Sequence, residues 1–265
     1  MGGHAPEPLP VEFKRLLELG YKKDPLCRRK IAIAKRLLEQ ELWETDVFVP
    51  GVRYVQKEPA FGGPVDTAPE LRAICGIAFA QLGRSDALDV LAELLADPEP
   101  VARLGAGRGL GDAGRPDATA LLRYKILLGD KEPEVIATCL ESLLHLGDAF
   151  EFCLQLLAAH DDRAESTALA LAGRRDPRAF EPIRAWGDSA LAEQRRRVAY
   201  VALALLRADA ATEHLLDVVR SGEQADAFAA AKALAIFKDD PAVVAKLRAA
   251  VPAKLRAQLD DLLGR

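Results

Sequence analysis

The chain has 265 residues and a formal net charge of −4; half of its residues are hydrophobic, but only 6% are aromatic. This composition excludes an intrinsically disordered chain, and no apolar run approaches the ~18 residues that would cross a bilayer. The slightly acidic balance argues against nucleic-acid binding unless one face gathers the basic residues, so a nucleic-acid partner is not expected but stays open. Alanine and leucine dominate the apolar residues, which favours helices.

The first ten residues, MGGHAPEPLP, have neither the basic start nor the apolar run of a secretory signal. We therefore expect a cytoplasmic protein with no membrane partner. Four cysteines stand among apolar residues without Cys-x-x-Cys spacing and are expected to be buried free thiols: Cys27, Cys75, Cys139 and Cys153.

Residues 1–42 are expected to form N-terminal capping helices and the first helix of a repeat. The stretch PVEFKRLLELGYKK predicts a helix whose apolar residues could cover the end of a helical stack: Val11, Leu16, Leu17 and Leu19. The next helix is predicted to begin after Asp24, which caps it, with Pro25 at its first position. Its apolar stripe is expected to comprise Cys27, Ile31, Ala34, Leu37 and Leu38.

Residues 43–66 break the helical pattern and are expected to form an inserted loop. A two-residue hairpin at Pro50–Gly51 is disfavoured, because an L-Pro-Gly pair favours a type II turn and such hairpins need the mirror-image types. We expect Pro50 to open a turn that leads into a short helix or an extended segment, which ends at Glu58–Pro59. The FGGP stretch that follows is typical of a bend.

Two interpretations of this long segment remain open. Loops of such length are usually functional or disordered, and this one has too many apolar side chains for disorder. It either folds over the N-terminal end of the helical stack, which needs covering, or contacts a protein partner. Because aromatic and arginine side chains dominate interface hot spots, the predicted partner-binding residues are Trp43, Phe48, Arg53, Tyr54, Gln56, Phe61 and Arg72.

Residues 67–251 repeat one pattern about six times: an apolar helix, a tight turn and a second helix. Asp66 or Thr67 is expected to cap the first of these helices, with Glu70 in capping-box spacing from Thr67. The turns recur about every 30 residues. They lie near Gly83, Gly114, Gly147, Gly173, Arg207 and Lys238. Small residues in the first helices could let helix axes approach closely: Ala78, Ala106, Ala168, Ala202 and Ala231.

One helix pair cannot bury its apolar stripe alone, so neighbouring pairs must stack into a continuous core. The sequence therefore predicts an all-α fold, a right-handed α-solenoid of stacked antiparallel helix pairs. Residues 252–265 are expected to form a C-terminal capping helix.

The stretch that begins DPEPVARLGAG carries the residues Asp97–Pro98, then Val101 and Arg103 near a helix start, then small residues and a glycine turn with Pro116–Asp117. On these residues the chain resembles the HEAT-repeat family, in particular the short bacterial HEAT-like repeats named after phycobilisome lyases. The resemblance implies a superhelix of helix pairs. It implies no single function, because HEAT folds serve as scaffolds, adaptors, chromophore lyases and a few DNA-repair enzymes.

No residue pattern predicts catalysis, a metal site or a cofactor. The four histidines lack metal-ligand spacing: His4, His145, His160 and His214. The stretch GAGRGLG, residues 105–111, follows no strand and has leucine where a dinucleotide-binding loop needs its third glycine. Its glycines are instead expected to permit close helix packing.

Three basic runs wrap around their helices and are expected to be solvated faces paired with nearby carboxylates: residues 28–36, 174–178 and 195–197. The sequence favours a non-catalytic scaffold or adaptor that binds a protein through its concave face and the 43–66 segment. The alternative is a nucleic-acid-binding or base-processing protein similar to HEAT-like DNA glycosylases. Its candidate residues, Trp186 with Asp188 and Trp43 with Asp46, match no motif of that class.

Overall fold

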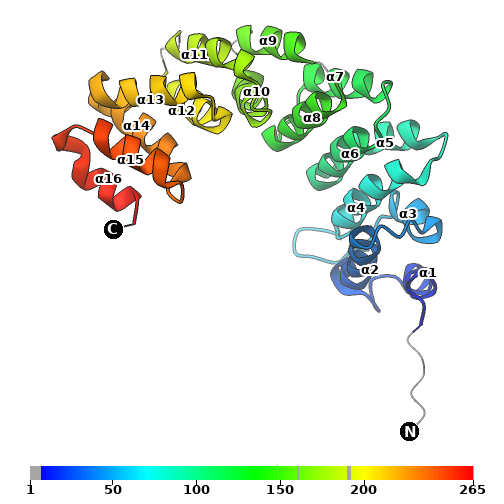
Figure 1. The fold of residues 1–265 in the computed structure, drawn as a ribbon. Helices are drawn as coiled ribbons and strands as arrows, with labels where there is room; N and C mark the ends of the chain where they lie inside the picture. Colours follow the sequence, from blue (N-terminus) through cyan, green and yellow to red (C-terminus); the bar gives the residue numbers. More distant parts are fainter. Residues whose placement is uncertain (1–6, 148, 160, 190–191, 265) are drawn as a thin grey trace. The chain divides into compact units, whose positions relative to one another are not determined.

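The computed structural model describes residues 7–147, 149–159, 161–189 and 192–264 (Figure 1). Contacts divide the chain into two compact units, Met1–Gly147 and Asp148–Arg265. Over the described residues the regular structure is helical, apart from one ladder of two short strands. The all-α architecture of stacked helix pairs that the sequence predicts is therefore confirmed.

The first unit begins with short N-terminal helices and continues with repeats. Its elements are α1 (Leu9–Leu19), α2 (Arg28–Glu39), α3 (Thr45–Gly51), β1 (Lys57–Glu58), β2 (Val65–Asp66), α4 (Pro69–Phe79), α5 (Ala87–Leu95), α6 (Pro100–Asp112), α7 (Ala118–Leu128) and α8 (Pro133–Leu146). The predicted first helices α4, α6 and α8 pack in a row, α4 on α6 and α6 on α8. The second helices α5 and α7 lie against this row, so the core of the unit forms between the two layers.

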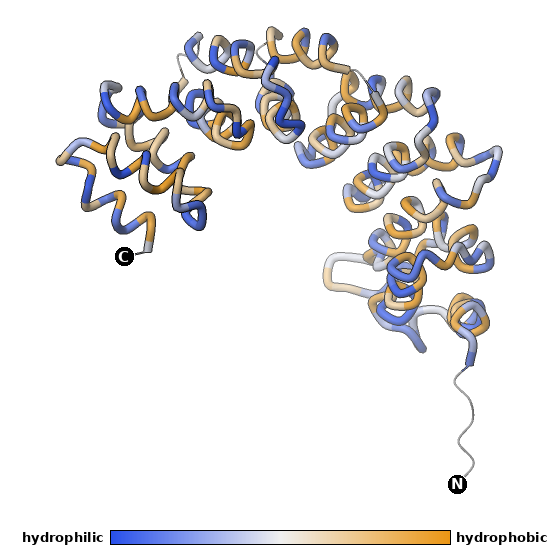
Figure 2. The backbone as a smooth tube through the Cα atoms, viewed as in Figure 1, coloured by the Kyte–Doolittle hydropathy of each residue, from blue (hydrophilic) through white to orange (hydrophobic). Residues whose placement is uncertain are grey.

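The second unit repeats the same arrangement. Its elements are α9 (Phe150–Ala158), α10 (Asp162–Gly173), α11 (Phe180–Asp188), α12 (Glu193–Leu206), α13 (Asp209–Ser221), α14 (Gln224–Leu234), α15 (Pro241–Ala250) and α16 (Arg256–Leu262). Helix α12 packs on both α10 and α14, and α14 also contacts α16. Figure 2 shows hydrophobic and hydrophilic residues alternating along the helices, as expected of helices that bury one face.

A residue in the left-handed conformation follows each of the first helices α4, α6, α10 and α12, but this residue is not always the expected glycine. Gly83 and Gly114 adopt φ angles of 64° and 62°, which glycine reaches without steric cost. In the second unit Arg175 and Arg207 adopt φ angles of 53° and 55° instead. The remaining predicted turn positions are not left-handed: Gly147, Gly173 and Lys238.

The first helices approach each other closely, as predicted. All five small residues named for this role are buried: Ala78, Ala106, Ala168, Ala202 and Ala231. In α6 a Cβ atom on Gly105 would overlap the backbone of Ala73 in α4, and one on Gly109 would lie 2.6 Å from the carbonyl oxygen of Gly76. The glycines of the 105–111 stretch therefore serve helix packing, which confirms that part of the sequence analysis.

The N-terminal helices bury a different set of residues from the one predicted. In α1, Phe13 and Leu16 are buried, whereas Val11 and Leu19 are exposed, so the predicted stripe is wrong at both ends. Asp24 accepts hydrogen bonds from N–H groups in the first turn of α2, as a cap does, but Pro25 lies in a preceding 3-10 turn and not in α2 itself.

The stripe of α2 also differs from the prediction. Cys27, Ala34 and Leu37 are buried as expected, and they are joined by Ile33 and by Lys30. Ile31 and Leu38 are only partly buried. Lys30 can be buried because the Asp24 carboxylate lies 2.9 Å from its Nζ atom. The spacing of apolar residues, from which the stripe was predicted, gives no sign of this ion pair.

The segment 43–66 holds more regular structure than a loop. Helix α3 packs against α4 and buries Val47 and Phe48. Pro50 lies inside α3 and does not open a turn, so that expectation is wrong. Burial of two apolar side chains, worth about 1.5–3 kcal/mol each, offsets the hydrogen bond that proline removes near the end of this short helix.

A hairpin follows α3, at a different place from the one considered in the sequence. There is none at Pro50–Gly51, as predicted; instead β1 pairs with β2, and the connection contains Gly62 and Gly63 with φ angles of 93° and 125°. We call residues 57–66 the hairpin. The expected cap of α4 is wrong for both candidates, because Ala68 occupies the N-cap position and neither Asp66 nor Thr67 caps the helix with its side chain. The Thr67 hydroxyl instead donates to the Glu58 carboxylate at 2.6 Å.

Candidate functional site

The base of the hairpin is fixed by a hydrogen-bond network. The Gln56 side-chain amide donates to the carbonyl oxygen of Asp24 at 2.9 Å and to Glu58 at 2.8 Å. The same Glu58 oxygen accepts from the backbone N–H of Leu26 at 2.6 Å. Hydrogen bonds from Thr67 and Gln56 lower the pKa of Glu58. The network ties the hairpin to the start of α2.

Arg72 fixes the other side of the same base. Its guanidinium pairs with both oxygens of Asp97 at 2.8 and 3.0 Å, with Asp66 at 2.8 Å and with the carbonyl oxygen of Tyr54 at 2.9 Å. Burial acts to raise the pKa of Asp66, but hydrogen bonds from the Ala68 N–H and from Arg72 hold it below its ordinary value. The charge of Arg72 is thus neutralised inside the unit.

The seven predicted partner-binding residues fall into two groups. Phe48, Gln56 and Arg72 are buried, and Tyr54 is half-buried with its ring 5.2 Å from the ammonium of Lys30. The structure brings Tyr54, Gln56 and Arg72 together in the network at the base of the hairpin. The other three are exposed: Trp43, Arg53 and Phe61.

The exposed group is spread along the segment. Phe61, at the tip of the hairpin, is fully exposed with a relative exposure of 110%, and the hairpin stands off the helices beside α4 (Figure 1). Trp43 lies between α2 and α3 and is 40% exposed. Arg53 forms a two-pronged ion pair with Glu93 of α5 at 2.7 and 2.9 Å.

The basic runs are mostly paired, as predicted. Arg29 contacts Glu12, and Lys35 contacts Glu70. Lys30 is also paired, with Asp24, but this pair is buried and not solvated. The later runs contain three further pairs: Arg178 with Asp176, Arg196 with Asp226, and Arg197 with Glu193.

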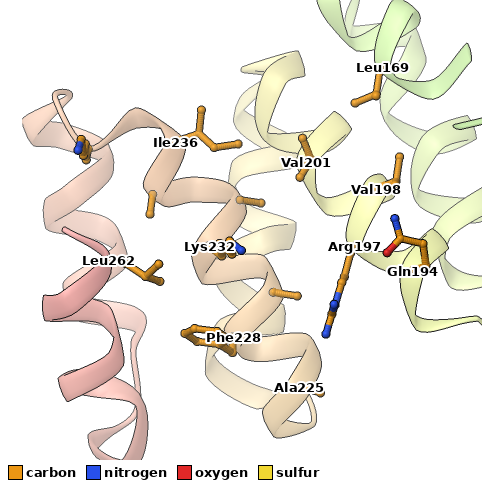
Figure 3. A pocket seen from close by; sticks show the side chains of 14 residues that line it. Leu169, Gln194, Arg197, Val198, Val201, Ala225, Phe228, Lys232, Ile236 and Leu262 are labelled. Atoms are coloured by element: carbon orange, nitrogen blue, oxygen red, sulfur yellow. The ribbon is translucent and has the colours of Figure 1, made fainter. Parts of the chain in front are cut away.

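A groove in the second unit was not anticipated from the sequence (Figure 3). It has a volume of about 640 Å³ and crosses the row of first helices from Leu169 on α10 to Leu262 on α16. Helices α12 and α14 supply most of its lining, with Val198 and Val201 on one and Phe228 on the other. Its remaining side chains include three cations: Arg197, Lys232 and Lys238.

The cysteine prediction is confirmed, since all four are buried and free. Burial raises the pKa of Cys27 to about 12, that of Cys139 to about 12, and that of Cys75 further still, so these thiols stay protonated near neutral pH. His145 and His214 lie in helices, whereas His4 and His160 lie outside the described residues. Across the described part of the chain, no cluster of three potential metal ligands occurs.

In the part of the chain that the structure describes, no helix has both the length and the apolar character needed to cross a bilayer.

Comparisons with known proteins identify the repeats. No curated protein matches the sequence. Among solved structures, the chain is similar to the complex of CpcE and CpcF of phycocyanin lyase from Nostoc, with 18% identity, coverage of 99% of this chain and 97% of that one, and a TM-score of 0.43. It is also similar to human deoxyhypusine hydroxylase, with 19% identity, coverage of 96% and 95%, and a TM-score of 0.38. The family model of HEAT repeats matches residues 65–143. Residues 65–143, which hold helices α4 to α7 and most of α8, are thus HEAT repeats, as the residue pattern predicted.

Proposed function

We propose that this chain is a non-catalytic protein-binding module that acts as a scaffold or adaptor. It contacts its partner through the exposed side chains of residues 43–66 and through the surface of its first helices. The observation that carries the proposal is the fully exposed Phe61, presented at the tip of a hairpin whose base is fixed by buried hydrogen bonds.

An exposed phenylalanine on a fixed hairpin is favourable for binding. Covering such a side chain removes apolar surface from water and contributes about 1.5–3 kcal/mol. Because Gln56 and Arg72 already hold the base of the hairpin, less conformational entropy is lost when the partner binds than for a free loop. These buried members of the predicted set support the contact surface without touching the partner.

The exposed members extend the surface beyond the hairpin tip. Trp43 and Arg53 belong to the residue types that are enriched at interface hot spots. Arg53 is already oriented by Glu93, so it can offer its remaining donors without reordering. The proposed contact surface therefore comprises Trp43, Arg53 and Phe61.

The test is affinity capture from a nuclease-treated native lysate, with Phe61→Ala as the variant and quantitative mass spectrometry as the readout. Nuclease treatment removes proteins that are captured through nucleic acid. Truncating a hot-spot aromatic should reduce recovery of the partner at least about tenfold. The melting temperature should change by less than about 2 °C, because Phe61 makes no buried contact.

Tyr124→Ala is the matched control, since Tyr124 on α7 is also an exposed aromatic residue of the first unit, 66% exposed. It should leave capture unchanged. Equal capture by wild type and Phe61→Ala, or equal losses in the two variants, would overturn the proposal.

A further inference from the structure

The groove in the second unit has the form of a docking surface for a helix. On α12, Gln194, Val198 and Val201 follow one another at helical spacing and face the groove. On α14, Phe228 and Lys232 also line the groove, followed by Ile236 in the next turn (Figure 3). Small alanines between these side chains leave room above the α14 backbone: Ala225, Ala229 and Ala233.

The dimensions of the groove suit an elongated ligand. It spans α10, α12, α14 and α16, each of which packs on the next. At 8–10 Å between neighbouring helix axes, this row extends over roughly 25 Å. Because its volume of about 640 Å³ is spread over that length, the groove is narrow. It therefore accommodates a single row of side chains.

A helix laid across the row would match this spacing. Residues seven apart on a helix are about 10.5 Å apart along its axis, close to the separation of neighbouring helices in the row. Apolar side chains at heptad spacing can therefore enter successive furrows between α12, α14 and α16. Two apolar residues at the groove are already accessible for such contacts: Leu169 and Ile236.

The charged residues that line the groove favour a negatively charged ligand. Among the described residues that line the groove, three are cations and none is a carboxylate. Arg197 forms an ion pair with Glu193, whereas Lys232 and Lys238 have no carboxylate partner among the described residues. A chain with a net charge of −4 attracts an acidic partner only where its positive charges gather, and this groove is such a place.

We infer that the groove binds an acidic amphipathic helix of a partner protein, whose apolar face enters the groove and whose carboxylates pair with Lys232 and Lys238. This inference deepens the proposed function, on which it rests, by naming a second contact surface and the chemistry of its occupant.

The test uses the intact chain and a fluorescein-labelled synthetic helix of about 18 residues, long enough for the groove. The helix carries leucine at the two apolar positions of each heptad and glutamate on its polar face. Fluorescence anisotropy should show saturable binding that weakens as salt rises. A scrambled peptide of the same composition and a peptide with lysine in place of glutamate should bind at least about tenfold more weakly.

Two groove variants and one control locate the binding site. Lys232→Glu and Ile236→Ala change exposed side chains, so both proteins should fold, and they should weaken binding of the acidic helix by about tenfold and about fivefold. Lys254→Glu makes the same charge change on an exposed residue of the same unit outside the groove, and it should leave the affinity within about twofold.

Three results would overturn the inference. One is equal binding of the acidic and scrambled peptides; another is an equal loss in Lys232→Glu and Lys254→Glu. The third is stoichiometric, Lys232-dependent binding of oleate without binding of the acidic helix, which would make the groove a site for small apolar acids.

The hairpin variant separates this inference from the proposed function. Phe61→Ala should bind the acidic helix as wild type does, and a loss there would place the peptide on the hairpin. If Phe61→Ala loses its captured partner but the acidic helix does not bind in the groove, only the inference fails. If capture is independent of Phe61 while Lys232→Glu loses the peptide, the hairpin-based proposal fails and the groove assignment stands.

Discussion

At the scale of single residues, two largely buried arginine–aspartate pairs join consecutive repeats of the first unit in the same way. Arg72 reaches Asp97, and Arg103 reaches Asp130, in each case with two hydrogen bonds. Each aspartate also accepts the backbone N–H two residues further on, at Glu99 or Glu132. The pairs therefore order the entry into the next first helix and link it to the previous one. The sequence had singled out Arg72, Asp97 and Arg103, but it predicted neither pair, because the two members of each pair lie 25 or 27 residues apart.

The second of these pairs should make stability depend on acid. Burial acts to raise the pKa of Asp130, but hydrogen bonds from Arg103 and Lys125 lower it well below its ordinary value of 3.8. A carboxyl group whose pKa is depressed by folding stabilises the protein above its unfolded pKa, near 4, and this contribution is lost as pH falls through the folded pKa. We expect the free energy of unfolding to decrease from pH 5 to pH 2, and to decrease less in Asp130→Asn.

Urea denaturation followed by circular dichroism at pH 7, pH 3 and pH 2 measures this difference. At pH 7, Asp130→Asn should be less stable by about 3 kcal/mol, because Arg103 and Lys125 lose their buried charge partner. Asp117→Asn changes an exposed aspartate and should keep the wild-type dependence on pH. The same acid dependence in Asp130→Asn and wild type would show that Asp130 contributes none of it.

At the scale of helices, close approach in the first row depends on glycine. In α6, Gly109 faces the backbone of Gly76 in α4 and the side chain of Leu91. Alanine has a higher helix propensity than glycine by about 1 kcal/mol, so an alanine here would stabilise an isolated helix. In the folded unit its Cβ would instead press on a carbonyl oxygen, which cannot move without shifting the helix.

Gly109→Ala should therefore destabilise the protein by about 1–3 kcal/mol despite its higher propensity. Gly173→Ala is the control, because a Cβ atom at this helical position of α10 meets nothing within 4 Å. It should leave stability unchanged or raise it by up to about 1 kcal/mol. Thermal or urea unfolding measures both, and a stabilising effect of Gly109→Ala would mean that the two helices can separate at no cost.

The sequence predicted the helices of the repeats. Periodic apolar residues identify α4 and α8 because each spans at least three turns. Helix α3 escaped prediction because seven residues with a proline among them carry no periodicity. The β1–β2 ladder has two residues in each strand, which is too short for an alternating pattern.

The site was predicted less completely than the fold. Composition pointed to the segment 43–66. It could not distinguish Phe61, which is exposed to solvent, from Phe48, which is on the buried face of α3. The groove could not be predicted from any one stretch, because α12 and α14 each supply only one side of it. A signal was present nevertheless: α14 and the turn after it are apolar on more than the one face that packs inward, with Phe228 and Ile236 beyond the core.

At the scale of the whole molecule, the chain has two compact units, each with its own set of buried apolar residues. In repeat proteins each repeat is stabilised mainly by its immediate neighbours, so a local substitution should weaken its own unit first. The two tryptophans allow this to be observed, because Trp43 belongs to the first unit and Trp186 to the second.

Two single-tryptophan proteins, Trp186→Phe and Trp43→Phe, report on one unit each. The indole N–H of buried Trp186 has no hydrogen-bond partner among the described residues, so phenylalanine should be tolerated there. Adding Asp24→Ala to each leaves Lys30 as an unpaired buried cation in the first unit and should cost about 3–5 kcal/mol. The urea midpoint seen by Trp43 should then fall clearly, and the one seen by Trp186 should fall by less than half as much. Equal shifts of both midpoints would show that the chain unfolds as one cooperative body and that nearest-neighbour coupling does not govern its stability.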